Sequence, residues 1–93
     1  MKELTKNDFN RAISGRLRRK IAAGKIDSGK EVIELRKFLN LTQLEFAEAM
    51  GISVYTLRNW EQGRRTPEGP AVALLRIAAR HPRIILSYLK SAA

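Results

Sequence analysis

Hydrogen-bonding and basic side chains gather in one short stretch of the chain, residues 54–65. The first part of this stretch offers short or hydrogen-bonding groups at Val54, Tyr55, Thr56, Arg58 and Asn59. Arginine and asparagine can pair with base edges in the major groove of DNA, whereas valine can contact only a thymine methyl group or the shape of the groove. Leu57 and Trp60 lie three residues apart, the spacing of one buried helical face. The stretch is therefore typical of a helix that reads base pairs.

The sequence lacks the residues that catalytic and metal-binding sites usually require. There is no cysteine and only one histidine, which excludes a disulfide framework, a thiol nucleophile, a Cys-ligated zinc or iron–sulfur site and a multi-histidine metal site. We find neither a nucleophile–base pair nor a phosphate-binding loop. Glu45 and Glu48 are explained by helix capping and by a solvated helix face. We therefore expect no enzymatic activity and no cofactor.

The charge balance favours a polyanionic partner. The 93 residues include 18 Lys and Arg against 9 Asp and Glu, which gives a formal net charge of +9. So large an excess on a short chain predicts attraction to nucleic acid or to an anionic membrane. No apolar run approaches the roughly 20 residues that span a bilayer, and no secretory signal follows Met1. We expect a cytoplasmic, nucleoid-associated protein that does not bind membranes.

Two short helices position the polar stretch. Thr42 and Glu45 form a capping box at the start of the first helix, and Gly51 ends that helix. Ser53 is a suitable N-cap for the second helix, which Gly63 ends. A link of about three residues that begins with glycine is the spacing of a helix-turn-helix motif, here over about residues 42–62. The predicted buried residues are Phe46, Ala47, Met50, Leu57 and Trp60.

Further helices are predicted on both sides of this motif. Ser28 and Glu31 form an N-cap pair, followed by a core face of Val32, Leu35 and Leu39. Thr66-Pro67 would begin a helix that ends at His81-Pro82, and a last short helix covers residues 84–89. Strand alternation and hairpin turns are absent, so we expect an all-α fold in which residues 29–93 form the helix-turn-helix domain.

Residues 1–28 predict a basic N-terminal helical arm with eight basic and three acidic side chains. Phe9, Ile13, Leu17 and Ile21 recur every four residues and form an apolar stripe. Gly24 is a plausible end of this helix. Two interpretations stay open at this point. The arm either docks on the core with a solvated basic face, or it binds a partner or tracks DNA.

Residues 32–80 resemble the DNA-binding domain of the phage Cro and lambda-repressor type, also called the XRE family. The matching residues are Leu35-Arg36, Leu41-Thr42-Gln43, Glu45-Phe46-Ala47, Met50-Gly51-Ile52-Ser53, Thr56-Leu57 and Trp60-Glu61-Gln62-Gly63. Within that family, the run Trp60 to Pro67 with Gly69-Pro70-Ala71 and Leu74-Leu75 resembles HigA-like antitoxins and NadS-type regulators. The resemblance implies a five-helix lambda-repressor-like domain, here with the additional arm, in a dimeric repressor paired with a RelE-like toxin of the HigB type.

The resemblance also implies roles for single residues. Gln43 matches a glutamine that contacts phosphate at a helix N-terminus, and Tyr55, Thr56 and Asn59 match base-reading positions. Arg36 and Glu61 match an internal ion pair that ties two helices together.

Four further residues are candidates for phosphate contacts. Thr42 and Ser53 either bind phosphate or only cap their helices. Arg64 and Arg65 either clamp phosphates or form a solvated basic loop.

The sequence thus predicts a sequence-specific repressor that binds a double-stranded operator as a homodimer. It also predicts the antitoxin of a type II toxin–antitoxin pair that regulates its own operon, with toxin contacts at Phe9, Ile13 and Leu17. One alternative is a stand-alone XRE repressor without a toxin, and another is a protein-binding module with a vestigial DNA surface.

Overall fold

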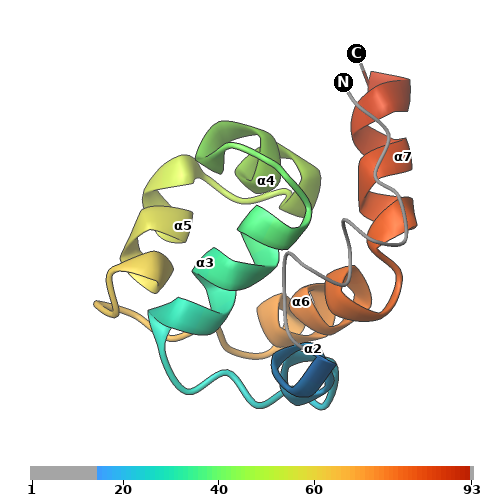
Figure 1. The fold of residues 1–93 in the computed structure, drawn as a ribbon. Helices are drawn as coiled ribbons and strands as arrows, with labels where there is room; N and C mark the ends of the chain where they lie inside the picture. Colours follow the sequence, from blue (N-terminus) through green and yellow to red (C-terminus); the bar gives the residue numbers. More distant parts are fainter. Residues whose placement is uncertain (1–14, 93) are drawn as a thin grey trace.

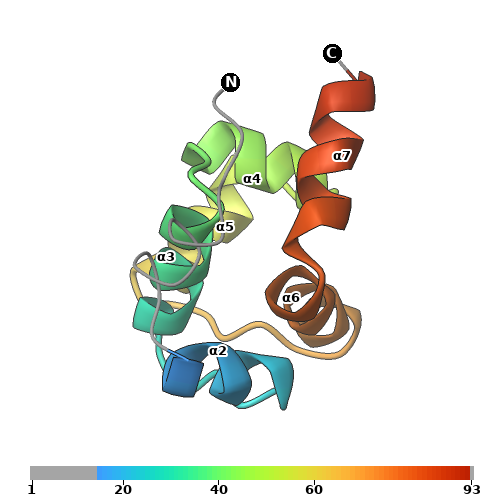
Figure 2. The same cartoon turned by 45° about the vertical axis from the view of Figure 1, so that its right-hand side comes forward.

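The computed structural model describes residues 15–92, and these residues form six helices and no strand. The predicted all-α fold is therefore confirmed for this part of the chain. The helices are α2 (Gly15–Ala22), α3 (Gly29–Phe38), α4 (Gln43–Met50), α5 (Val54–Glu61), α6 (Pro70–Arg80) and α7 (Pro82–Ala92). In Figures 1 and 2, α3, α4 and α5 lie together on one side, α7 stands opposite, and α2 and α6 lie below them.

One hydrophobic core joins these helices. The largest fully buried side chains are Phe38, Phe46, Ile21, Leu35, Leu39, Leu57, Leu75 and Val32. Ala47, Met50 and Trp60 are buried as well, so the core contains the predicted faces of α3, α4 and α5, and it extends to α2 and α6. α2 contributes side chains to the same core as α5. The helices of the motif are therefore supported by residues that precede them and by residues that follow them in the sequence.

The predicted helix boundaries of the motif agree with the structure. The Thr42 hydroxyl accepts a hydrogen bond from the Glu45 backbone N–H at 3.1 Å, and the Glu45 carboxylate accepts one from the Thr42 N–H at 2.9 Å. Gly51 adopts φ 70°, a left-handed conformation that glycine reaches without steric cost. The turn into α5 begins there, so the direction of α5 depends on this glycine.

The start of α6 differs from the sequence prediction. The helix begins at Pro70, with Gly69 as its N-cap, and not at Thr66-Pro67. A helix beginning at Pro67 would place Pro70 in its fourth position. There the proline ring lacks the N–H that the first intrahelical hydrogen bond needs, and it clashes with the preceding turn. The second proline therefore decides which of the two start signals is used.

The described part of the arm, α2, is fastened to α6 by two arginines. Arg18 Nε donates to the Ala79 carbonyl at 2.9 Å, and Arg76 Nε donates to the Ala22 carbonyl at 3.1 Å. Each guanidinium therefore satisfies a carbonyl in the last turn of the opposite helix, where no intrahelical donor remains. Arg18 also lies over the Phe38 ring, 5.6 Å from its centroid. Of the two interpretations of the arm, docking on the core holds for residues 15–22.

Candidate DNA-binding surface

The turn between α4 and α5 is held by backbone hydrogen bonds. The Gly51 N–H donates to Glu48 O at 3.2 Å and the Ile52 N–H donates to Ala47 O at 3.0 Å. Ser53 then caps α5, because its hydroxyl accepts from the Thr56 N–H at 3.0 Å. With Leu57 and Trp60 buried on one side of α5, the other side of the helix is left to face solvent.

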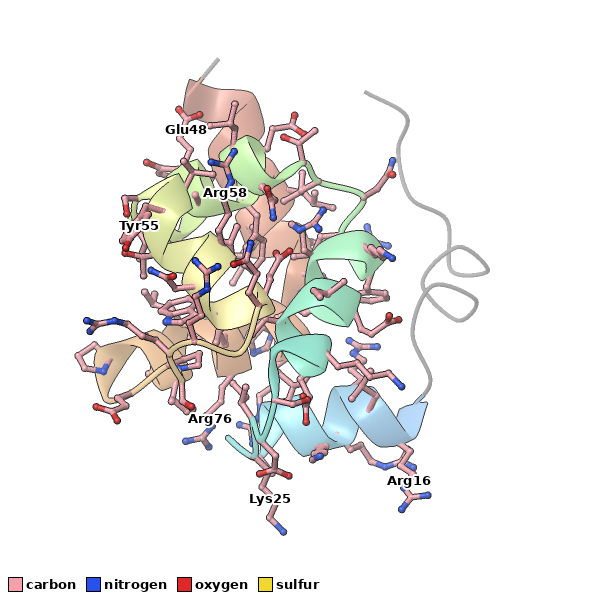
Figure 3. The ribbon with its side chains drawn as sticks, turned by 90° about the vertical axis from the view of Figure 1, so that its left-hand side faces the viewer. Arg16, Lys25, Glu48, Tyr55, Arg58 and Arg76 are labelled. Carbon is pink, nitrogen blue, oxygen red and sulfur yellow. The ribbon has the colours of Figure 1, made fainter. Side chains whose placement is uncertain are left out.

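The exposed side of α5 carries most of the residues predicted to read bases. Tyr55 is 70% exposed and Arg58 is exposed, and both project from the outer side of the helix in Figure 3. Val54 and Thr56 at the first turn are partly exposed. Val54 also packs partly against the core, so Tyr55 and Arg58 form the exposed part of this surface. The four residues are here called the reading face (Val54, Tyr55, Thr56 and Arg58).

Asn59 departs from the prediction, because it is only 6% exposed. The loop after α5 folds back at this point, and the backbone N–H groups of Arg64 and Arg65 donate to the Asn59 carbonyl at 2.9 and 3.3 Å. The loop therefore covers the last turn of α5 and places Arg64 and Arg65, both exposed, beside it. The loop is held by the Asn59 backbone carbonyl, and the buried Asn59 side chain is not part of the exposed surface of α5.

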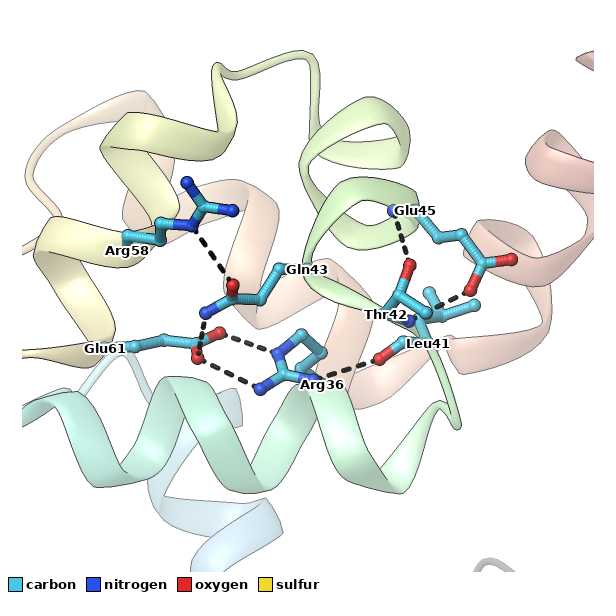
Figure 4. A network of polar contacts seen from close by, with 7 residues as sticks. All are labelled: Arg36, Leu41, Thr42, Gln43, Glu45, Arg58 and Glu61. Carbon is cyan, nitrogen blue, oxygen red and sulfur yellow. Dashed lines mark hydrogen bonds and ion pairs between the residues drawn. The ribbon is translucent and has the colours of Figure 1, made fainter.

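Arg36 and Glu61 form the ion pair that the resemblance implies. Arg36 Nε and Nη2 donate to Glu61 Oε2 and Oε1 at 2.7 and 3.0 Å, which is a bidentate arrangement. Arg36 Nη1 also donates to the Leu41 carbonyl at 3.2 Å. The pair joins α3 to the end of α5 and to the segment that leads into α4 (Figure 4).

Gln43 lies in the middle of a chain of polar contacts (Figure 4). Its Nε2 donates to Glu61 Oε1 at 3.1 Å, and its Oε1 accepts from Arg58 Nε at 3.2 Å. The sequence alone predicts a phosphate contact for Gln43 and no link to Arg58. Because the two residues lie 15 positions apart on different helices, no local sequence signal predicts that link.

The remaining predicted contacts fall into two groups. Thr42 and Ser53 are N-caps, and the Ser53 hydroxyl in addition donates to Thr56 Oγ1 at 2.9 Å. Leu17, the one predicted toxin contact within α2, is partly buried against the core. Phe9 and Ile13 lie outside the described residues.

Two negative findings apply to residues 15–92. No group of three or more His, Asp or Glu side chains there could hold a metal ion. No helix in this range is long and apolar enough to cross a membrane.

Comparison with known proteins identifies the family to which the chain is similar. Residues 2–88 match the family model described as MqsA, the antitoxin component of a bacterial toxin–antitoxin system. Antitoxin HigA-2 of Vibrio cholerae is 41% identical over 58 residues, which cover 62% of this chain and 56% of that protein. Antitoxin MqsA of Escherichia coli is 33% identical over 54 residues, which cover 58% of this chain and 41% of that protein.

A third relative belongs to a different class of protein. Over 39 residues the chain is 49% identical to the type II methyltransferase M.SsoII of Shigella sonnei, a match to 39% of this chain and 10% of the enzyme. The chain thus spans about half or less of the length of the curated relatives that it matches. No solved structure matches it significantly.

Proposed function

The chain belongs to the family of MqsA, the antitoxin component of a bacterial toxin–antitoxin system, and from this premise we propose that it is a DNA-binding repressor and antitoxin. In this proposal the α4–α5 motif binds a double-stranded operator in a sequence-specific manner. Repression of its own operon is the regulatory outcome that operator binding would produce. Operator binding also accounts for the excess of basic residues, since phosphate contacts dominate the affinity of such proteins.

The observation that carries the proposal is the division of α5 into two sides. Leu57 and Trp60 are buried while Tyr55 and Arg58 are exposed, which is the arrangement of a recognition helix lying in a major groove. Arg64 and Arg65 lie directly beside the end of this helix. We propose that they contact phosphates. The exposed residues Thr42 and Ser53, which cap their helices, are further candidates at the helix N-termini.

We further propose that the protein binds as a homodimer. Helix-turn-helix dimers bind two half-sites whose centres lie about one helical turn, roughly 34 Å, apart. An operator for this chain should then be an inverted repeat with that spacing.

A selection experiment tests operator binding. The protein is incubated with a pool of random DNA duplexes, and the bound duplexes are amplified and sequenced over several rounds. We expect an inverted repeat to be enriched. The Thr56→Ala variant should show weaker preference at the half-site and nearly unchanged affinity for the unselected pool. Recovery of unchanged random sequences by the wild-type protein would refute the proposed function.

The toxin partner is proposed to be a RelE-like protein of the HigB type, in accordance with the resemblance to HigA-like antitoxins. The similarity to Antitoxin HigA-2 and Antitoxin MqsA supports a toxin partner over a stand-alone repressor. Co-expression with the product of the adjacent reading frame tests this. A stable complex that suppresses the toxicity of that product supports the antitoxin role. Free operator binding without any complex would favour the stand-alone repressor.

A further inference from the structure

We infer that Gln43 is a positioning residue, which acts through Arg58 and holds its guanidinium for contact with a guanine. The inference rests on the proposed function of the α4–α5 motif and names the side chain that sets one element of its specificity. The observation behind it is the chain of contacts from Arg36 through Glu61 and Gln43 to Arg58.

Chemistry fixes the orientation of the Gln43 amide. An ionised carboxylate only accepts hydrogen bonds and a guanidinium only donates them. Gln43 must therefore turn its NH2 group toward Glu61 and its carbonyl oxygen toward Arg58, as the structure has it. The reversed amide would place oxygen against oxygen and N–H against N–H. Gln43 thus converts the fixed position of Glu61 into a fixed acceptor for Arg58.

The anchor of this chain is rigid. Glu61 receives two hydrogen bonds from Arg36, and the exposed fractions of the two side chains are 6% and 17%. Buried bidentate pairs have little freedom to move, because separation would leave a charge without a partner in a site of low dielectric constant. An amide held by such a pair is therefore itself held in place.

The contact leaves the end of Arg58 available. Only Nε of Arg58 donates to Gln43, and within the described residues its two terminal nitrogens have no hydrogen-bond partner. These nitrogens form the end-on fork that matches O6 and N7 of guanine. A free arginine loses rotamer entropy when it forms such a contact, and a guanidinium held beforehand loses less. Gln43 therefore supports the contact without touching the base.

A double-mutant cycle separates this role from a phosphate contact. Selection with the Arg58→Ala variant first identifies the guanine whose preference is lost. Two probes are then compared: the duplex selected by the wild-type protein, and the same duplex with adenine in place of that guanine. Arg58→Ala should lower discrimination between the two duplexes by about tenfold or more. Gln43→Ala should lower it by at least about threefold in the wild-type background and have almost no further effect in the Arg58→Ala background. Gln62→Ala, a matched change at an exposed glutamine, should leave discrimination unchanged.

A second measurement needs no DNA. In the free protein, ¹⁵N relaxation of the Arg58 Nε–H group should show greater order than that of the exposed Arg64. The Gln43→Ala variant should remove that difference, whereas Gln62→Ala should keep it.

Two results would overturn the inference, and a third would refute the proposed function on which it rests. Equal mobility of Arg58 in the wild-type and Gln43→Ala proteins would overturn it. So would a Gln43→Ala effect that adds fully to that of Arg58→Ala and is the same on selected and random DNA, because that is the behaviour of an independent phosphate contact. A wild-type protein that selects no sequence would instead refute the proposed function itself.

Discussion

Glu31 and Glu61 are buried carboxylates, and each accepts hydrogen bonds from a basic side chain and from a polar neighbour. Glu61 organises the motif helices, while Glu31 caps α3 and connects it to α2 through Lys20. A buried charge is stable only while it keeps such partners. Both carboxylates therefore give predictions that belong to single side chains.

Removal of one partner of the Arg36–Glu61 pair should destabilise the domain. We expect Arg36→Ala to lower the free energy of unfolding by roughly 3–5 kcal/mol, because Glu61 would keep a buried charge without its partner. Urea denaturation measures the change. The double variant Arg36→Met/Glu61→Leu should recover most of the loss, since it removes both charges. A single variant as stable as the wild-type protein would show that the pair is not needed.

The acid stability of the domain should depend on Glu31. Burial alone raises the pKa of Glu31, but hydrogen bonds from Ser28, Lys20 and the backbone N–H groups of Glu31 and Asp27 outweigh it and lower the pKa from 4.5 to about 2. The hydrogen bond to Glu31 in turn raises the pKa of Lys20. The pKa of Glu31 is lower in the folded than in the unfolded protein. Ionised Glu31 therefore stabilises the fold fully above the unfolded pKa, and this stabilisation is lost as the pH falls toward 2.

Glu31→Gln tests this contribution. At pH 7 the variant should be less stable by up to about 3 kcal/mol, and the difference should vanish progressively between roughly pH 5 and pH 2. Denaturation at a series of pH values measures it. Glu48→Gln on the exposed side of α4 is the matched control and should show no such trend. A Glu31→Gln deficit that stays constant with pH would contradict the assignment.

Arg65 should contribute affinity without sequence preference if it contacts a phosphate. We expect Arg65→Ala to weaken binding to selected and random duplexes alike and to make the slope of log affinity against log salt shallower by about one. Fluorescence anisotropy over a range of salt concentrations measures the slope. Arg80→Ala, at the exposed end of α6, is the control. An unchanged slope would exclude the contact.

At the scale of elements, the N-terminus of α3 lies very close to the C-terminus of α5. A Cβ atom on Gly29 would overlap the carbonyl oxygens of Trp60 and Glu61 and would lie 2.7 Å from the Glu61 carbonyl carbon. Only glycine permits this approach, because backbone atoms cannot move aside as a flexible side chain can. Gly29 thus determines how near α3 lies to α5.

Substitution of Gly29 should therefore shift α5. We expect Gly29→Ala to destabilise the domain by about 1–3 kcal/mol and to weaken DNA binding beyond what the stability loss explains. Gly15→Ala, whose methyl group would meet only the far end of the Arg19 side chain, should be nearly neutral. Thermal unfolding and anisotropy measure the two effects. Equal stability of the two variants would show that the close approach relaxes at no cost.

Local signals predict most of the elements, although Pro70 overrides the start signal at Thr66-Pro67. The capping boxes at Ser28 and Thr42 and the left-handed glycine at position 51 act within a few residues, so the sequence alone indicates the helices that they bound. The loop that follows α5 bonds to the Asn59 backbone, whereas the engagement of Gln43 results from packing of α4 against α5. The Gln43 contacts do not follow from a local pattern.

At the scale of the whole molecule, α2 is an integral part of the domain. Ile21 is 1% exposed and lies in the common core. Arg18 of α2 donates a hydrogen bond to α6, and Arg76 of α6 donates one to α2. The basic residues of α2 are therefore not all available to a partner. Arg18 and Lys20 are engaged in contacts within the protein.

Ile21→Ala should consequently destabilise the entire domain. We expect a loss of about 2–5 kcal/mol in one cooperative transition, because the vacated core volume is shared with the other helices. The Ile77→Ala variant is the matched control, since Ile77 is 43% exposed on α6. Chemical denaturation followed by circular dichroism measures both. Independent melting of α2 in the Ile21→Ala protein, with the remainder intact, would show that the arm is a separate unit.

The position of Trp60 has a consequence for fluorescence measurements on this protein. It is the single tryptophan of the chain, and it lies buried on the inner side of α5. Its fluorescence therefore reports on α5 alone, with an emission maximum at shorter wavelength while the helix is packed and at longer wavelength when water reaches the indole ring. Any variant of this protein that fails to bind DNA can be sorted by that spectrum into one whose α5 is displaced and one whose α5 is intact but has lost a contact.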